Sequence, residues 1–259
     1  MKKFLAAVLA MTLLLAMFLT GCGKKDKTVV LVVSFGTSYN DSREVTIGAI
    51  EGAIQAANPD LEVRRAFTSQ IIIDKLKERD GLEIDNVTQA LDRAVADGVT
   101  TLIVQPTHLM HGFEYTDLKD ELANYNDKFD KIVLGEPLLN SDDDFGRVAD
   151  ALSGDTASYD DGSTAIVFMG HGTEADSNEV YAKMQGVMEE KGLANYYVGT
   201  VEATPSLDDV IAAIKDKGYS RVVLEPMMVV AGDHANNDMA GDEEDSWKTI
   251  LTGEGYEVE

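Results

Sequence analysis

Short apolar runs alternate with segments of helical periodicity along most of the chain. Four runs rich in β-branched residues have the length of buried strands and lie at residues 29–35, 61–68, 99–105 and 131–134. Helical patterns lie between them, at about residues 41–57, 86–96 and 115–125, with a further stretch ending near residue 78. Asp41 and Ser42 are candidate caps for the first of these helices. Strands that alternate with helices predict an α/β fold with a parallel sheet covered on both faces.

The second half of the chain repeats this plan. Residues 31–45 align with residues 166–180 when one position is skipped, and residues 98–112 align without gaps on residues 218–232. Chance similarity of glycine-containing stretches is the alternative, but the two matches keep the same order along the chain. The repeat therefore predicts two similar lobes with parallel sheets, flavodoxin-like or Rossmann-like, which face each other across a cleft. We place the N-terminal lobe at residues 29–140 and the C-terminal lobe at residues 141–259.

The offset between the two halves also makes a prediction about residues 243–259. It places the fourth strand of the second half just after Gly253, so that residues 255–259 are expected to begin a strand. A helix is expected before it, at about residues 243–251. By this reasoning the second lobe looks truncated within its last strand, which would cost stability because strand edges and apolar surface would be exposed.

Residues 1–22 have the pattern of an export signal. Lys2 and Lys3 precede an apolar run at residues 4–19, which is short for a membrane span. The run ends in the sequence LTGC, which resembles the lipobox of bacterial lipoproteins, where the cysteine is lipidated. Residues 23–28 then form a polar tether. We therefore expect an extracytoplasmic lipoprotein that is anchored to a membrane through Cys22; a plain membrane anchor or an uncleaved apolar segment is the alternative.

The composition narrows the range of functions. Acidic residues number 46 against 22 basic ones, for a net charge of −24, which argues against nucleic acid as a partner and against adhesion to anionic lipid. Cys22 is the only cysteine, so the folded part has neither an internal disulfide nor a thiol nucleophile.

The main candidate for chemistry is His171. It follows a buried apolar run at residues 165–169, and Gly170 and Gly172 flank it before a helical pattern begins at Asp176. It is thus expected at the carboxyl edge of a sheet, where ligands bind in open α/β folds. A histidine that only packs in a turn is the alternative.

Comparison of the two halves adds two more residues. His171 stands where the first half has Phe35, and His234 stands where it has Glu114. Glu202 closes the second strand of the second half, at the same edge. Two imidazoles and one carboxylate suit a borderline divalent ion such as Co²⁺, Fe²⁺, Ni²⁺ or Zn²⁺.

At these residues the chain resembles a known family. The sequences MGHGT around His171, GTVEATPS around Glu202 and AGDHANNDMAGDEEDSWK at residues 231–248 are similar to the anaerobic sirohydrochlorin cobaltochelatases, a branch of the class II chelatases. Residues 32–51 are similar to that family's first strand and helix. The resemblance implies insertion of Co²⁺ into a tetrapyrrole, in cobalamin biosynthesis, within a cleft between two α/β lobes. It also implies that His171, Glu202 and His234 bind the metal, that His171 and Glu202 are catalytic, and that His171 accepts a proton.

Several further expectations follow for substrates and partners. Co²⁺ is the expected substrate metal, with Fe²⁺ or Ni²⁺ as alternatives, and no organic cofactor is expected. A tetrapyrrole rich in carboxylates needs local donors in so acidic a protein, and helix-start amides and hydroxyls can supply them. We expect these donors at Ser34, Thr37, Ser38 and Thr173. A homo-oligomer is compatible with the sequence.

Two alternatives stay open from the sequence. The same site would serve a non-catalytic lipoprotein that captures a metal or a tetrapyrrole for a transporter. His108 and His111 could chelate a metal or contact a haem edge if their loop were helical, but we interpret them as a pair that lines the cleft or the surface.

Overall fold

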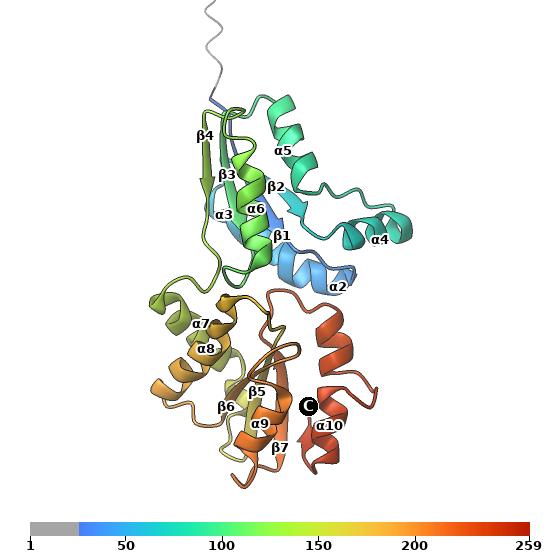
Figure 1. The fold of residues 1–259 in the computed structure, drawn as a ribbon, viewed down its shortest axis with the longest axis vertical. Coiled ribbons are helices and arrows are strands. Elements are labelled where there is room, and N and C mark those ends of the chain that lie inside the picture. The colour runs from blue at the N-terminus through green and yellow to red at the C-terminus, as the bar shows by residue number, and fades with distance from the viewer. Residues whose placement is uncertain (1–25) are drawn as a thin grey trace, which may run out of the picture.

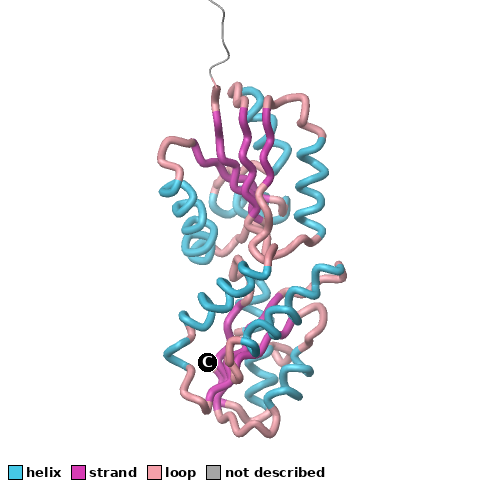
Figure 2. Tube along the Cα trace, turned by 90° about the vertical axis from the view of Figure 1, so that its left-hand side faces the viewer, coloured by secondary structure: helices cyan, strands magenta, loops and turns pink. Residues whose placement is uncertain are grey.

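The computed structural model describes residues 26–259. The signal sequence and Cys22 lie outside the described residues. The described chain forms two lobes, which lie end to end along the long axis of the molecule (Figures 1 and 2). Within residues 26–259, none of the helices has the length and the apolar character needed to cross a bilayer.

The N-lobe is built on a parallel sheet with the strand order β2-β1-β3-β4. Its strands are β1 (Thr28–Ser34), β2 (Glu62–Phe67), β3 (Thr101–Pro106) and β4 (Lys131–Leu134). The central strand β1 is buried from Val29 onward, as its continuous apolar sequence predicts for a strand covered on both faces.

Helices cover both faces of this sheet. They are α2 (Asn40–Arg43), the π-helix η1 (Glu44–Gly48), α3 (Ala49–Ala57), α4 (Gln70–Asp80), α5 (Val87–Ala96) and α6 (Phe113–Ala123). Apolar residues of α5 and α6 pack on one face, against Leu31 and Val104. The predicted cap of the first helix is wrong, because the helix begins at Asn40, after Tyr39, with no side-chain cap. The Ser42 hydroxyl donates instead to the carbonyl of Ala231, in the other lobe, at 2.6 Å.

The C-lobe repeats the same topology, with the strand order β6-β5-β7-β8. Its parallel strands are β5 (Thr164–Gly170), β6 (Tyr196–Thr200), β7 (Arg221–Pro226) and β8 (Glu257–Val258). The two sheets therefore confirm two similar lobes related by the internal repeat. The strand expected near residue 255 is present as β8, whose residues Glu257 and Val258 pair with Arg221 and Val222.

Seven helical segments belong to the described residues that follow β4. They are α7 (Asp142–Asp155), η2 (Ala157–Tyr159), η3 (Asp176–Asn178), α8 (Glu179–Glu190), α9 (Leu207–Ile214), η4 (Ala235–Met239) and α10 (Trp247–Gly253). Helices α7 and α8 cover the β5 side chains Ile166 and Phe168, whereas α9 and α10 cover the opposite face. The helix predicted from residue 243 begins only at Trp247, because the Ser246 hydroxyl caps it by accepting from the Thr249 amide at 3.1 Å.

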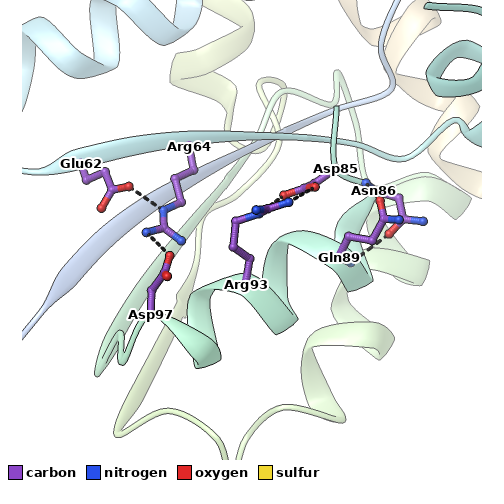
Figure 3. A network of polar contacts seen from close by, with 7 residues as sticks. All are labelled: Glu62, Arg64, Asp85, Asn86, Gln89, Arg93 and Asp97. Carbon is purple, nitrogen blue, oxygen red and sulfur yellow. Dashed lines mark hydrogen bonds and ion pairs between the residues drawn. The ribbon is translucent and has the colours of Figure 1, made fainter. Parts of the chain in front are cut away.

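A set of ion pairs joins β2 to helix α5 in the N-lobe (Figure 3). Arg64 of β2 donates to Glu62 at 2.8 Å and pairs with Asp97, just after α5, at 2.8 Å. One turn earlier, Arg93 binds both carboxylate oxygens of Asp85, at 2.7 and 2.8 Å. These contacts fix α5 on the side of the lobe, away from the C-lobe.

The lobes meet at the carboxyl ends of their strands. Tyr39, after β1, donates from its hydroxyl to Asp233, after β7, at 3.2 Å, and Ser42 donates to Ala231 nearby. Apolar contacts cross the same junction, since Met110 packs against the core of the C-lobe and Val230 packs against Phe67 and its neighbours in the N-lobe. The loops expected to carry the chemistry thus lie at the junction of the lobes.

Candidate metal centre

The first predicted residue, His171, is held in place by the residues on either side of it. It follows β5 directly, and its side chain is 48 % exposed. Gly172 has a φ of +88°, and a Cβ there would lie 2.8 Å from the Ala203 backbone nitrogen, so that only glycine fits this turn. The Gly172 amide donates to the hydroxyl of buried Tyr181 at 3.3 Å. The turn that presents His171 is therefore tied to helix α8.

The structure brings the other two predicted residues to the same point. The Glu202 amide donates to the His171 carbonyl at 2.9 Å, which links the loop after β6 to the loop after β5. His234 precedes helix η4, and its ring meets the His171 ring edge to face, with centroids 4.5 Å apart. One donor atom from each of His171, Glu202 and His234 lies within 4.8 Å of the others.

Hydrogen bonds to the Nδ1 atoms leave both Nε2 atoms free. His171 Nδ1 lies 2.7 Å from the Gly172 carbonyl oxygen, and that acceptor requires Nδ1 to carry the proton. His234 Nδ1 lies 2.6 Å from a carboxylate oxygen of Asp238. A carboxylate or carbonyl behind a ligating imidazole fixes its tautomer and orientation. Both Nε2 lone pairs are thereby available to bind a metal, and that of His171 lies 3.9 Å from a carboxylate oxygen of Glu202.

The arrangement can hold a divalent ion and still leave coordination positions open. The triad supplies three ligands, two neutral and one anionic, and the side chains of Glu202 and His234 are 54 % and 31 % exposed. A site that is closed on one side and open on the other can pass its ion to another set of ligands. The geometry agrees with the predicted metal site, and its binding of metal stays a prediction.

The residues predicted to bind the substrate lie nearby but use their polar groups internally. Ser34, Thr37 and Ser38 are buried, at 1 %, 2 % and 4 % exposure. Ser34 accepts from the Thr107 hydroxyl at 2.8 Å, and Thr37 accepts from the Tyr39 amide at 3.2 Å. Thr173 is half-buried, and its hydroxyl accepts from the Ala175 amide at 3.2 Å. The hydroxyls of Ser34, Thr37 and Thr173 thus stabilise the loops, and the contact of all four residues with substrate stays a prediction.

His108 and His111 do not act as a pair. Their loop is not helical, and each ring faces a different group. His111 is 44 % exposed and lies 3.0 Å from the Asn140 side-chain oxygen, whereas His108 is 10 % exposed and lies 3.7 Å from the Glu114 carboxylate. The sequence spacing of His108 and His111 does not indicate that the two rings contact different groups.

Sequence reasoning missed two residues that support the site. Asp238 lies four residues after His234, and this i,i+4 spacing on a helical turn could have indicated a partner for the imidazole. Tyr181 gave no such signal, because its contact with Gly172 depends on how α8 packs on β5.

Comparison with known proteins identifies the family of the chain. Residues 28–259 match the family model described as cobalt chelatase (CbiK). The chain is 40 % identical over 229 residues to the sirohydrochlorin cobaltochelatase of Salmonella typhimurium, with 88 % of this chain and 86 % of the relative covered. It is 31 % identical over 231 residues to the sirohydrochlorin cobaltochelatase CbiKC of Nitratidesulfovibrio vulgaris, with 88 % and 81 % covered.

A solved structure supports the fold. SirB from Bacillus subtilis, solved with Fe³⁺, superposes with a TM-score of 0.62 at 14 % identity, over 90 % of this chain and 87 % of that one. At this identity the likeness bears on the fold alone. With the family match over nearly all described residues and the two similar relatives, the chain belongs to the CbiK cobalt chelatase family.

Proposed function

We propose that this protein is a sirohydrochlorin cobaltochelatase, which inserts Co²⁺ into the macrocycle at the junction of the two lobes. The observation that carries the proposal is the convergence of His171, Glu202 and His234, whose donor atoms lie within 4.8 Å of one another. Membership of the cobalt chelatase family and the names of the two relatives support the same activity.

The ligand set suits an ion that must be delivered rather than stored. Two imidazole nitrogens and a carboxylate bind borderline ions such as Co²⁺, Fe²⁺ and Ni²⁺ well, and Glu202 offsets part of the charge of the ion. Three protein ligands leave coordination positions of the ion open. The macrocycle nitrogens can bind at these positions and then replace the protein ligands one by one. Co²⁺ is our proposed substrate, and Fe²⁺ and Ni²⁺ are the alternatives that a metal comparison would separate.

Metal insertion also requires the release of two protons from the pyrrole nitrogens. Once the ion has moved to the macrocycle, the Nε2 lone pair of His171 is free to accept one of them. The junction of the lobes holds the macrocycle and the ion together, which lowers the entropic part of the barrier.

Anaerobic insertion of Co²⁺ into sirohydrochlorin, followed by absorbance, tests the proposal. We expect turnover by the wild-type protein and its loss in His171→Ala, with the thermal melting curve unchanged because His171 is half-exposed and its removal leaves no core cavity. Parallel reactions with Fe²⁺ and Ni²⁺ give the order of metal preference. Tight binding of metal or macrocycle without turnover would refute the catalytic proposal and favour a binding lipoprotein.

We also propose that the enzyme acts outside the cytoplasm, anchored by a lipid on Cys22. The support is the sequence of residues 1–22, with its basic start, short apolar run and LTGC end. Membrane fractionation of wild-type protein and Cys22→Ser tests this. Equal release of both forms into the soluble fraction would contradict the anchor.

A further inference from the structure

The internal repeat places two serines in equivalent positions. Ser42 lies in α2, the first helical segment after β1, and Ser177 lies in η3, the first helical segment after β5. Each belongs to a sequence Asp-Ser-x-Glu-Val, and the two sequences align in the repeat. Helix α2 lies at the end of the N-lobe that faces the C-lobe (Figure 1). We therefore compared the contacts that the two serines make with the opposite lobe.

The loops that follow β3 and β7 are equivalent as well, and they share one hydrogen-bond pattern. In the loop after β3, the Gly112 amide donates to the Met110 carbonyl at 2.9 Å. In the loop after β7, the Gly232 amide donates to the Val230 carbonyl at 3.0 Å. In both loops the glycine carbonyl accepts from the backbone amide four residues later, at 3.1 and 3.2 Å, and from the side chain of that same residue. The two loops thus have the same local structure.

The two serines nevertheless differ in their partners. The residue before the glycine is Ala231 in one loop and His111 in the other. The Ala231 carbonyl accepts from the Ser42 hydroxyl at 2.6 Å, and this bond joins the lobes. The repeat predicts the same bond from Ser177 to the His111 carbonyl. Within residues 26–259, however, the Ser177 hydroxyl oxygen is buried without a hydrogen-bond partner, and no amide or side chain donates to the His111 carbonyl.

Ser177 and its expected acceptor lie on adjoining segments. A Cβ built on Gly112 would lie 3.9 Å from the Ser177 hydroxyl oxygen, so this oxygen lies beside the loop. Apolar contact between the same parts of the molecule already exists, because Met110 packs against the core of the C-lobe. A buried hydroxyl is more stable when it is paired. A short shift of residues 107–112 toward η3 would supply the missing bond.

We propose that Ser177 and the His111 carbonyl form a clasp that is open in the free protein and closes when the macrocycle lies between the lobes. This inference rests on the proposed function. Ser177 belongs to the segment that follows His171, so closure draws a loop of the N-lobe toward the metal triad. A ligand that contacts both lobes favours the state in which they lie closer together. Ser177 is thus a positioning residue, which holds the loop near the macrocycle and takes no part in the chemistry.

The strength of a single hydrogen bond suits a contact that a ligand controls. The net effect of one such bond on an equilibrium constant is about 2- to 12-fold. A macrocycle with this modest preference for the closed state is enough to change which state predominates. The Ser42–Ala231 bond is present in the free protein and serves as the internal reference for the clasp.

The first test compares Ser177→Ala with Ser42→Ala, its equivalent in the repeat. Ser177→Ala removes a hydroxyl that is unpaired in the free protein, so the melting temperature should not fall, and Co²⁺ affinity without the macrocycle should be unchanged. The Kd for sirohydrochlorin, measured by absorbance titration, should rise about 2- to 12-fold. Ser42→Ala removes a bond that already exists, so the melting temperature of the free protein should fall by about 1–6 °C.

The second test detects closure directly by disulfide formation. The variants are Gly112→Cys with Ser177→Cys, in a Cys22→Ser background that leaves no other thiol. Gly112 has a φ of −87°, and its added Cβ would make no contact shorter than 3.8 Å, so cysteine fits there. Disulfide formation, followed by thiol titration, should be about 2- to 12-fold faster with saturating sirohydrochlorin, because the bound protein spends more time closed. The pair Gly232→Cys with Ser42→Cys is the matched control, and its rate should not depend on sirohydrochlorin.

The outcomes separate the clasp from a merely structural role. Unchanged affinity of Ser177→Ala for sirohydrochlorin would overturn the clasp, and so would a disulfide rate that sirohydrochlorin does not change. A melting temperature of free Ser177→Ala that falls as far as that of Ser42→Ala would also overturn it, because the hydroxyl would then be paired already. A wild-type protein that binds no sirohydrochlorin would refute the proposed function and the clasp with it. A wild type and a Ser177→Ala variant that bind it equally well refute the clasp alone.

Discussion

Replacement of Gly170 by alanine tests how the C-lobe positions His171. Gly170 is the last residue of β5 and directly precedes the histidine. An added Cβ would lie 2.1 Å from Cε1 and 2.7 Å from Cζ of Tyr181, whereas ordinary contact begins at 3.4 Å. Gly170 is not among the glycines with positive φ, so the cost of the substitution is steric and not conformational.

The magnitude follows from the surroundings of Tyr181. Its ring is 1 % exposed and packs among the core residues Met184 and Phe168, so a shift of more than 1 Å disturbs the core. Overpacking of this kind costs about 1–3 kcal/mol. The shift also removes the acceptor of the Gly172 amide, and an unpaired buried amide costs about 1–3 kcal/mol more. The two costs together are about 2–6 kcal/mol, so at about 2–4 °C per kcal/mol for a chain of this size we expect the melting temperature to fall by about 4–24 °C.

Gly186→Ala is the matched control. Gly186 lies in the same helix as Tyr181, and a Cβ there meets nothing within 4 Å. That change should stabilise the protein by about 0.5–1 kcal/mol, because alanine is the better helix former. Thermal melts and Co²⁺ calorimetry on both variants provide the readouts, and Gly170→Ala should also bind Co²⁺ more weakly. A Gly170→Ala protein that melts within 1 °C of wild type and binds Co²⁺ normally would refute the idea that Tyr181 fixes the His171 turn.

Three further changes have expected outcomes. Asp238→Asn should weaken Co²⁺ binding about 10–100-fold in calorimetry, because His234 loses the charge that orients it; unchanged affinity would exclude this role. Glu202→Gln keeps the shape of the side chain but removes its charge, so it should weaken Co²⁺ binding while sirohydrochlorin binding, measured by absorbance titration, stays the same; equal loss of both would contradict a metal-ligand role. Burial, and then the nearby charge of Asp155, raises the pKa of Glu225 in the folded protein. Above this raised pKa the ionised carboxylate destabilises the folded state, whereas below the usual carboxyl pKa the group is protonated in both the folded and the unfolded state and has no such effect. Glu225→Gln should therefore raise the melting temperature at pH 7 and leave it unchanged near pH 3; a gain that is the same at both pH values would show that charge is not the cause.

The sheets were the most predictable part of the fold. The central strands β1 and β5 are continuous apolar runs, and this pattern depends only on neighbours in sequence. Helix starts were less predictable, because a side chain that could cap a helix can instead form a hydrogen bond with a residue distant in sequence. Ser42 looks like a cap but bonds to Ala231, which lies 189 residues away. The π-helix η1 also has no local signal in the sequence.

In the candidate site, too, the features that follow from the strand order were predictable and those that depend on tertiary packing were not. His171, Glu202 and His234 could be assembled from sequence because each follows a strand, and parallel strands deliver their carboxyl ends to one edge. The Glu114–His108 contact could not, since it depends on how the loop after β3 lies against the start of α6. Likewise, Ser34 and Thr37 look like exposed donors in sequence, but both are buried and their hydroxyls accept hydrogen bonds within the N-lobe.

The hydrogen bonds of Tyr39 and Ser42 to the segment after β7 have a mechanical consequence. The loop that carries His234 is attached covalently to the C-lobe and non-covalently to the N-lobe. Within residues 26–259, the hydrogen bonds of His171 and Glu202 run only to the C-lobe. A hinge rotation between the lobes must either break both hydrogen bonds or change the spacing between His234 and the other two ligands. The Co²⁺ affinity should therefore change with the angle between the lobes.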